Sequence, residues 1–185
     1  MARTPSNMLK LGTKATDFKL FCPAKNTFQS LNELRGEKGT VIIFMCNHCP
    51  FVVYIIDELV RIADEYSSKG ISFIGINAND VENFPEDSPE KMIEFASTHT
   101  MNFAYLYDKT QEIAKMYDAA CTPDLYLFDE NMLLIYRGQL DDARPGNSNA
   151  NNGKDLRNAI ENLLKNLPQD EFQKPSLGCN IKWKI

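Results

Sequence analysis

Two short and almost wholly apolar runs stand in the first half of the chain, at Thr40–Met45 and Ile71–Ile76. Both contain several β-branched residues, which is typical of strands buried on both faces of a sheet. Between them the apolar positions adopt a helical spacing of i, i+4, i+7 and i+11, at Ile55, Leu59, Ile62 and Tyr66. Gly70 follows as a helix stop signal. The order strand, helix, strand predicts a right-handed parallel crossover.

The segments on either side of this unit predict further strands and helices. The expected strands are Asp17–Phe21 with its hairpin partner Thr27–Leu31, then Phe103–Tyr107, and a second hairpin of Leu125–Phe128 and Met132–Tyr136. The expected helices are Pro89–Ser97, Thr110–Tyr117 and a last helix carrying Leu156, Ile160, Leu163 and Leu164. The pattern therefore predicts an α/β fold with a mixed central sheet flanked by helices.

The length of 185 residues is that of one ordinary domain. We expect a single domain over residues 1–185, with a core at about 8–166 and an irregular C-terminal tail at 167–185. Hydrophobic residues make up 43% of the chain and charged residues 24%, which excludes a disordered or fibrous protein.

Charge and hydropathy narrow the range of partners. The net charge of −5 argues against duplex nucleic acid as a partner. No apolar run approaches the ~20 residues of a membrane-spanning helix, so we expect no membrane partner. The segment Met1–Lys10 lacks the apolar stretch of a signal peptide, which favours a cytoplasmic location. The pattern carries no signal for the oligomeric state.

The five cysteines, at positions 22, 46, 49, 121 and 179, carry the candidate chemistry. In a reducing cytosol, cysteines that lie close together are more often catalytic or metal-bound than structurally paired. Cys46-Asn47-His48-Cys49 joins the first buried strand to the first helix. A thiol at a helix N-terminus meets unpaired N–H groups and the positive end of the helix dipole, which favour the thiolate.

Pro50 indicates which of these two cysteines is the nucleophile. If Cys46 capped the helix, Pro50 would fall at the fourth helical position, where proline costs about 3 kcal/mol. If Cys49 is the cap, Pro50 stands at the first helical position, where proline is favoured. Proline also pushes the residue before it toward the extended backbone that a cap residue adopts. We therefore predict Cys49 as the low-pKa nucleophile and Cys46 as its partner thiol.

Several segments resemble the thioredoxin superfamily, and among its members the peroxiredoxin-like group related to alkyl hydroperoxide reductase and thiol-specific antioxidant proteins. The segments that carry this resemblance are Asp17–Leu20, Val41–Phe44, Gly75–Asp80, Cys49-Pro50, Thr122-Pro123, Tyr136–Gln139 and Lys174–Trp183. The resemblance implies a thioredoxin-like fold with an N-terminal hairpin extension. In thioredoxins the first motif cysteine lies five residues after a strand phenylalanine, and counting from Phe44 reaches Cys49.

Two departures from the peroxiredoxin pattern bear on the activity. Peroxiredoxins carry threonine three residues before the reactive cysteine, and this chain has Cys46 there. They also carry an arginine before the late strand, where this chain has Pro123. Thr122-Pro123 is similar to the thioredoxin cis-proline loop, which packs against the active-site cysteine and pairs with the backbone of a disulfide substrate. The resemblance thus implies that Thr122 and Pro123 orient the substrate, and it favours dithiol–disulfide exchange.

The remaining candidates each have a functional and a structural interpretation. His48 either tunes the thiolate or is a solvated loop residue. Cys121 is either an accessory thiol near the site or a small buried apolar residue, and the second is favoured. Cys22 and Cys179 are predicted to be structural, with a fold-back of Cys179 toward the site as the less favoured alternative.

The first functional hypothesis is a thiol-disulfide oxidoreductase that needs no metal or organic cofactor. Its substrate is a disulfide-containing protein or a small oxidised thiol or peroxide, and a cellular dithiol donor resets the pair of cysteines. One alternative is a peroxiredoxin-type peroxidase, in which Cys49 becomes a sulfenic acid that condenses with Cys46 or Cys121. The other is a Cu(I)- or Zn-binding module that uses Cys46, His48 and Cys49.

Overall fold

Strand β4 (Gly39–Phe44), the first of the two apolar runs, lies inside a seven-stranded sheet in the computed structural model. The structure describes residues 3–184, so the ends of the expected domain, Met1, Ala2 and Ile185, lie outside it. β4 pairs in parallel with β5 (Ile71–Asn77) and antiparallel with β8 (Asp124–Asp129). Its six residues are all buried, because strands on both sides and helices above and below remove it from water.

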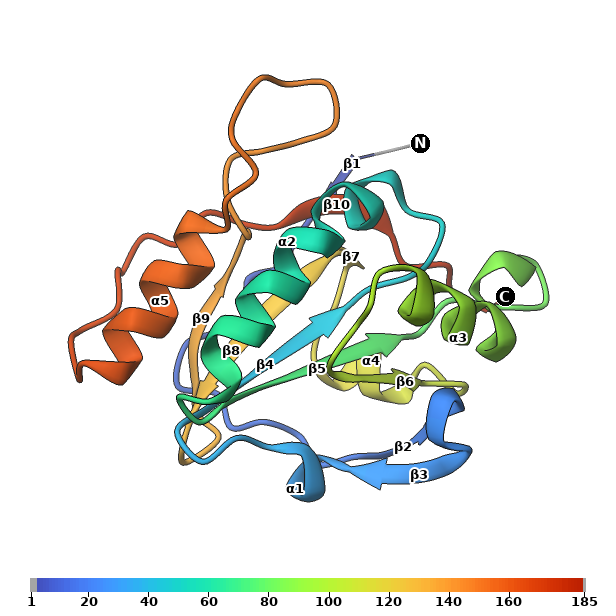
Figure 1. Ribbon diagram of the computed structural model, residues 1–185, viewed down its shortest axis with the longest axis horizontal. Coiled ribbons are helices and arrows are strands. Elements are labelled where there is room, and N and C mark those ends of the chain that lie inside the picture. The colour runs from blue at the N-terminus through green and yellow to red at the C-terminus, as the bar shows by residue number, and fades with distance from the viewer. Residues whose placement is uncertain (1–2, 185) are drawn as a thin grey trace.

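The sheet has the order β3-β2-β6-β5-β4-β8-β9 and mixes parallel with antiparallel pairs (Figure 1). Its remaining strands are β2 (Lys19–Cys22), β3 (Thr27–Ser30), β6 (Ala104–Tyr107) and β9 (Leu134–Gly138). The N-terminal hairpin β2–β3 extends one edge, and β9 forms the other. The mixed sheet, its flanking helices and the hairpin extension predicted from the sequence are confirmed.

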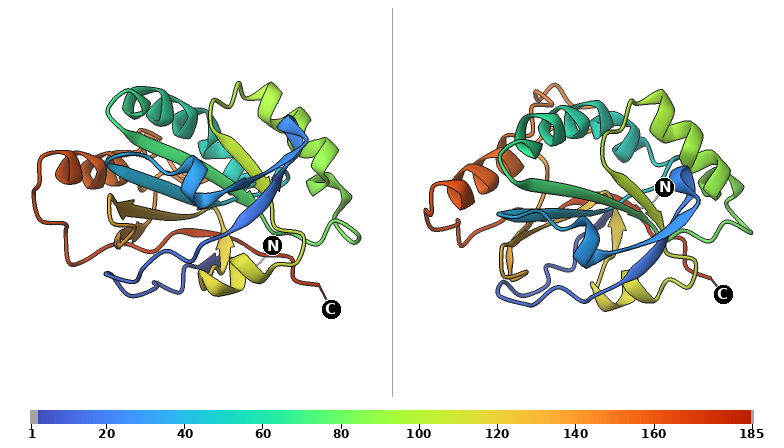
Figure 2. Two further views of the ribbon diagram at one scale, coloured as in Figure 1. Left: turned by 90° about the horizontal axis from the view of Figure 1, so that it is seen from below. Right: turned by 60° about the horizontal axis from the view of Figure 1, so that its bottom comes forward.

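Helices cover both faces of this sheet (Figure 2). One face carries the three longest helices, α2 (Pro50–Ser67), α3 (Pro89–Thr98) and α5 (Lys154–Leu164). The other carries α4 (Glu112–Met116), and the single turn α1 (Leu31–Leu34) follows the hairpin. None of the helices within residues 3–184 is long and apolar enough to cross a membrane.

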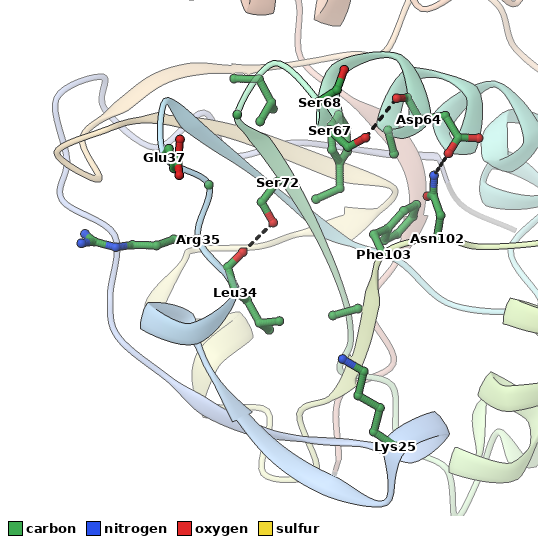
Figure 3. Close-up of a pocket in the computed structure, with 16 residues that line it drawn as sticks. Lys25, Leu34, Arg35, Glu37, Asp64, Ser67, Ser68, Ser72, Asn102 and Phe103 are labelled. Atoms are coloured by element: carbon green, nitrogen blue, oxygen red, sulfur yellow. Dashed lines mark hydrogen bonds between the residues drawn. The ribbon is translucent and has the colours of Figure 1, made fainter.

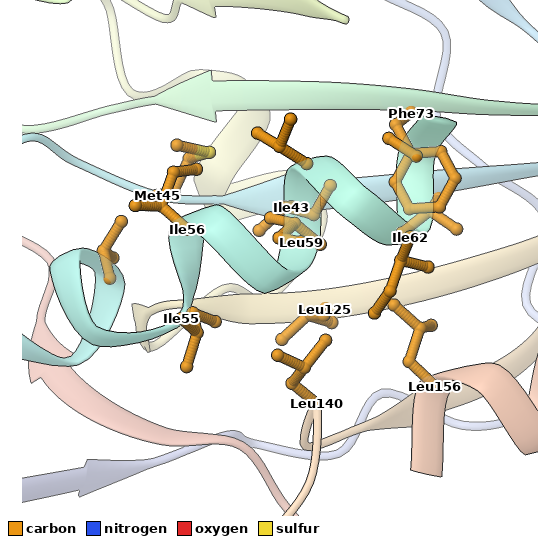
Figure 4. Packing of buried hydrophobic residues seen from close by; sticks show 14 of the residues in the cluster. Ile43, Met45, Ile55, Ile56, Leu59, Ile62, Phe73, Leu125, Leu140 and Leu156 are labelled. Carbon is orange, nitrogen blue, oxygen red and sulfur yellow. The ribbon is translucent and has the colours of Figure 1, made fainter. Parts of the chain in front are cut away.

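Helix α2 is held on the sheet by the apolar stripe that predicted it. Ile55, Leu59, Ile62 and Tyr66 are all buried in one hydrophobic cluster with residues of the sheet and of α5. Figure 4 shows Leu59 and Ile62 of this helix facing side chains of the sheet. Because such a cluster resists displacement, α2 provides a rigid base for the residues at its N-terminus.

A second, three-stranded sheet was not predicted and corrects the description of the C-terminal tail. β10 (Leu177–Asn180) lies between β1 (Arg3–Pro5) and β7 (Cys121–Thr122) in antiparallel pairs. The tail at 167–185 is therefore not irregular throughout. β10 is four residues long and its partners are distant in the sequence, so no local alternation of apolar and polar residues could indicate it.

Candidate active site around three cysteines

Cys49 is the N-cap residue of α2, as the position of Pro50 predicts. The backbone of Cys49 is extended, with φ −71° and ψ 121°, and Pro50 is the first helical residue. The carbonyl of Cys49 accepts the hydrogen bond of Val53 N–H at 3.0 Å, which begins the helical ladder. The Cys49 side chain is 0% exposed and points into the space between the start of α2 and the second sheet.

The other residues predicted for the site converge on Cys49. Cys49 Sγ lies 3.1 Å from the carbonyl oxygen of Thr122, to which it donates when it is protonated. Cys46 Sγ lies 3.3 Å from Thr122 Oγ1, and the Thr122–Pro123 peptide bond is cis. The structure therefore places Cys46 and Thr122 beside the Cys49 sulfur, with Pro123 joined to Thr122 by the cis peptide bond.

Cys179 is a member of this cluster that the favoured sequence interpretation placed elsewhere. Its Sγ lies 2.8 Å from Cys49 Sγ, and in β10 it stands directly opposite Thr122. The location of Cys179 matches the less favoured sequence interpretation, in which the tail folds back toward the site. The segment Lys174–Trp183 belongs to the family resemblance, and that was the one signal in the sequence that pointed to it.

The hydrogen bonds around Cys49 favour its ionised form. The Cys46 thiol, which donates to the Cys49 sulfur, is the largest cause that lowers the pKa of Cys49, from 9.0 to about 5. Burial opposes this shift, while the Cys179 thiol and backbone N–H groups of Val52 and Cys179 support it. Cys49 is therefore a thiolate at neutral pH, which is the nucleophilic form.

The two neighbouring thiols stay protonated. The pKa of Cys46 is raised well above 9.0, first because Cys46 donates its proton to Cys49 and then because it is buried. Burial, followed by the hydrogen bond to Cys49, raises the pKa of Cys179 to about 12. One ionised sulfur therefore stands between two thiols, which is the distribution of protons that thiol exchange at Cys49 requires.

His48 contacts a buried carboxylate that sequence reasoning missed. His48 Nδ1 lies 2.8 Å from Asp87 Oδ2, and this partner raises the pKa of His48 above 6.5. The same carboxylate accepts hydrogen bonds from the backbone N–H of Asn47 and from Asn79 Nδ2, each at 2.7 Å. Asp87 thus holds the loop before Cys49 in place. Asp87 is far from the cysteine motif along the sequence, in a polar segment, and no spacing pattern pointed to it.

The side chains that the structure brings together as potential metal ligands differ from the predicted set. Sulfur, nitrogen and oxygen atoms of Cys46, His48 and Asp87 lie within 4.8 Å of one another. Cys49, which the metal hypothesis included, is not part of this group. Because Asp87 already accepts three hydrogen-bonding or charged contacts, the arrangement is accounted for by its role in holding the loop.

The two remaining cysteines, Cys121 and Cys22, are both buried. Cys121 donates to the carbonyl oxygen of Pro123 at 3.5 Å, and burial strongly raises its pKa. Its role as an accessory thiol stays a prediction. Cys22 belongs to the hydrophobic cluster on the opposite face of the sheet from α2, which agrees with a packing role.

A pocket of about 670 Å³ has Lys25, Leu34 and Phe103 among its lining residues (Figure 3). Ser72, at the start of β5, is among its lining residues and donates to the Leu34 carbonyl at 2.5 Å. Cys49 follows the far end of β4, which runs parallel to β5. None of the five cysteines, all within the described residues, lines this pocket.

The low pKa of Cys49 predicts an unusual titration. On acidification, the ultraviolet absorbance of one thiolate should disappear near pH 5 rather than near pH 9. Because the folded pKa is lowered, the ionised group stabilises the fold fully above about pH 9, and this contribution is lost as the pH falls through about 5. Cys49→Ser is the control and should remove the transition, whereas a transition that persists in this variant would assign the thiolate to another cysteine.

Two solved structures are closely similar to this chain along nearly its whole length. A protein from Geobacillus kaustophilus, described as an uncharacterized conserved protein, is 50% identical, with a TM-score of 0.97 over 100% of this chain and 97% of that one. A hypothetical protein from Sinorhizobium meliloti is 42% identical, with a TM-score of 0.95 over 98% of each chain. No curated protein sequence matches this chain.

More distant structures show the fold. The thioredoxin domain of a thiol-disulfide oxidoreductase from Bacteroides vulgatus superposes with a TM-score of 0.66, at 18% identity, over 84% of this chain and 99% of that one. The fold is therefore thioredoxin-like. Residues 11–137, which include the motif from Cys46 to Cys49 and the Thr122-Pro123 loop, match the AhpC/TSA family. The chain belongs to the AhpC/TSA family.

Proposed function

We propose that this protein is a thiol-disulfide oxidoreductase in which Cys49 is the nucleophile and Cys46 is its partner. The observation that carries the proposal is the Cys49 thiolate at the start of α2, with the Cys46 thiol donating to it and Thr122 contacting both sulfurs. A nucleophile of lowered pKa beside a second thiol is the arrangement that forms and resolves mixed disulfides.

The proposed cycle begins when the Cys49 thiolate attacks one sulfur of a substrate disulfide. The substrate S–S bond breaks, and the other sulfur leaves as a thiolate. Cys46 then gives up its proton and attacks Cys49 Sγ, which releases the second substrate sulfur. The substrate disulfide is reduced to two thiols, and Cys46 and Cys49 are oxidised to one disulfide. A dithiol donor, as a reducing cytosol supplies, returns them to the starting state.

His48 and Asp87 are positioned to take part in the second step. Their donor atoms and Cys46 Sγ lie within 4.8 Å of one another, while the pKa of Cys46 is raised, so this thiol needs an acceptor for its proton. A carboxylate beside an imidazole is suited to accept a proton from a neighbouring thiol. We assign His48 and Asp87 this role. The strand edge at Thr122 is already paired with Cys179 of β10, so the predicted orienting of the substrate falls to Pro123, which lines a small pocket with Phe51.

The surroundings of Cys49 support disulfide exchange over peroxide reduction. Cys46 occupies the sequence position at which peroxiredoxins carry threonine, and its sulfur contacts Thr122 Oγ1. Arg137, a buried arginine of β9, pairs with the carboxylate of Asp124 at 3.1 Å and donates to the backbone carbonyl of Asp118 at 2.8 Å. Its charge is thereby held by these groups and not by the Cys49 sulfur.

Disulfide mapping tests the proposal directly. Reduced protein is treated with glutathione disulfide, alkylated, digested without reductant and analysed by mass spectrometry. We expect a Cys46–Cys49 disulfide that dithiothreitol reverses, together with catalysis of insulin-disulfide reduction by dithiothreitol. Cys22→Ser is the matched control, because Cys22 is buried in the cluster on the opposite face, and it should behave as the wild type.

Two outcomes would contradict this function. One is hydroperoxide consumption with a thiol donor while neither insulin nor glutathione disulfide is reduced, which would establish the peroxidase alternative. The other is attachment of glutathione to Cys46 at an undiminished rate in the Cys49→Ser variant, which would reverse the roles of the two cysteines.

A further inference from the structure

We infer that Cys179 is a second resolving thiol, which attacks the mixed disulfide on Cys49 from strand β10. The inference deepens the proposed function and rests on it, because it requires Cys49 to form a mixed disulfide with a substrate. It gives the C-terminal strand a part in the reaction, where the sequence predicted an irregular tail.

The position of β10 is the first observation. β10 pairs antiparallel with β7, with Cys179 opposite Thr122 and Asn180 opposite Cys121. The edge beside Thr122 and Pro123 is the one along which the resemblance places the backbone of a disulfide substrate. The chain thus lays one of its own strands in that place, and the residue of this strand nearest to Cys49 is a cysteine.

The contact between the two sulfurs is the second observation. Cys179 Sγ lies 2.8 Å from Cys49 Sγ, and the backbone N–H of Cys179 also favours the Cys49 thiolate. A disulfide needs a separation of about 2.03–2.05 Å, so the two sulfurs have to approach by a further ~0.8 Å to form the bond. Cys46 approaches the same sulfur from the loop before α2, so Cys49 has a thiol on either side.

The close approach of β10 to β7 depends on Gly178. A Cβ atom at this residue would lie 2.0 Å from the backbone carbonyl oxygen of Thr122, a distance that no side chain can occupy. Anchors on both sides keep the strand in register: Ser176 Oγ donates to the Gly138 carbonyl at 2.8 Å, and the Lys182 carbonyl accepts from Asp80 N–H at 2.9 Å. The fold therefore holds Cys179 in contact with Cys49.

The proposed step conserves atoms and electrons. Cys49 carries one substrate sulfur in a mixed disulfide, and Cys179 Sγ attacks Cys49 Sγ while that bond breaks. The substrate sulfur leaves with the electron pair and takes up the proton that Cys179 gives up. The products are a Cys49–Cys179 disulfide and a substrate thiol. Attack of Cys46 on Cys49 can then release Cys179 as a thiol and form the Cys46–Cys49 disulfide, with no further oxidant.

The test compares two variants that lack Cys46, so that Cys179 is the one neighbouring thiol left to resolve the adduct. Cys46→Ser and Cys46→Ser/Cys179→Ser are treated with glutathione disulfide and mapped by mass spectrometry. We expect a Cys49–Cys179 disulfide in the first variant. In the second, glutathione on Cys49 should rise at least about tenfold, because the intramolecular competitor is lost.

The controls distinguish the proposed role of Cys179 from the proposed function itself. Cys46→Ser/Cys22→Ser has the same number of thiols as the double variant and should map like Cys46→Ser. Cys179→Ala in place of serine, with thermal unfolding of each variant, excludes a loss of fold as the cause. Equal glutathione on Cys49 in both test variants, without a Cys49–Cys179 disulfide, would overturn the role of Cys179 and leave the proposed function intact. Absence of glutathione from Cys49 in both variants, with no Cys49–Cys179 disulfide in Cys46→Ser, would overturn the proposed function, and this inference with it.

Discussion

Cys49→Ser is expected to lower the rate of insulin-disulfide reduction at least about 10³-fold, as removal of an essential nucleophile does in other enzymes. The wild-type sulfur has a pKa of about 5 and is ionised at neutral pH. A serine hydroxyl at the same position is not ionised, and its oxygen cannot form a disulfide with a substrate or with Cys46. The measurement is turnover with dithiothreitol as the donor, at equal protein concentration.

Two companion measurements show whether the loss is chemical. Circular dichroism and thermal unfolding should find the variant folded, since serine differs from cysteine by one atom. Cys22→Ser, the matched buried replacement, should retain wild-type turnover. If Cys49→Ser kept more than about a tenth of the activity, the rate-determining nucleophile would be another residue.

Asp124→Ala is expected to lower the free energy of unfolding by about 3–5 kcal/mol, because it leaves the buried charge of Arg137 without its buried carboxylate partner. Asp124 and Arg137 are both 0% exposed, and Arg137 Nη2 lies 3.1 Å from Asp124 Oδ2. The guanidinium also lies over the ring of Tyr126, 4.6 Å from its centroid. With alanine at 124, the arginine would keep its charge in a site closed to water. Urea unfolding measures the loss.

A second acidic partner of the same arginine provides the control. Asp118 Oδ2 lies 3.9 Å from Arg137 Nη1, and this side chain is 51% exposed. Asp118→Ala should cost at most about 1 kcal/mol, since an exposed partner contributes little. The double variant Asp124→Leu/Arg137→Met should recover much of the stability lost in Asp124→Ala, because it removes both charges together. Equal losses for Asp124→Ala and Asp118→Ala would show that burial of this pair is energetically unimportant.

The strand–helix–strand unit was predictable because its signals are local. β4 is apolar along its whole length and α2 carries a 3.6-residue stripe, so each element could be identified without its neighbours. Which of the two motif cysteines begins the helix was predictable for the same reason. Pro50 restricts its own backbone and that of Cys49 through steric contacts between adjacent residues, and Cys49 is the N-cap in the structure.

The second sheet was not predictable from such signals. β10 has no periodic pattern, and it becomes a strand because β1 and β7 supply its hydrogen-bonding partners. Asp87 is likewise an ordinary residue of a polar loop until the fold brings its carboxylate to His48. Both depend on contacts between parts of the chain that are far apart in sequence, which pattern reasoning over short windows does not detect.

The sequence by itself determined which cysteine begins the helix, because proline geometry and helix capping act over one or two bonds. It also indicated the family through short motifs along most of the chain. Only the tertiary structure decided what surrounds that cysteine. Cys179 reaches Cys49 because the closing strand pairs beside Thr122, and the low pKa of Cys49 arises from donors supplied by the loop before α2 and by that strand. Hydrogen bonds and desolvation depend on distances in space, and these exist only once the chain has folded.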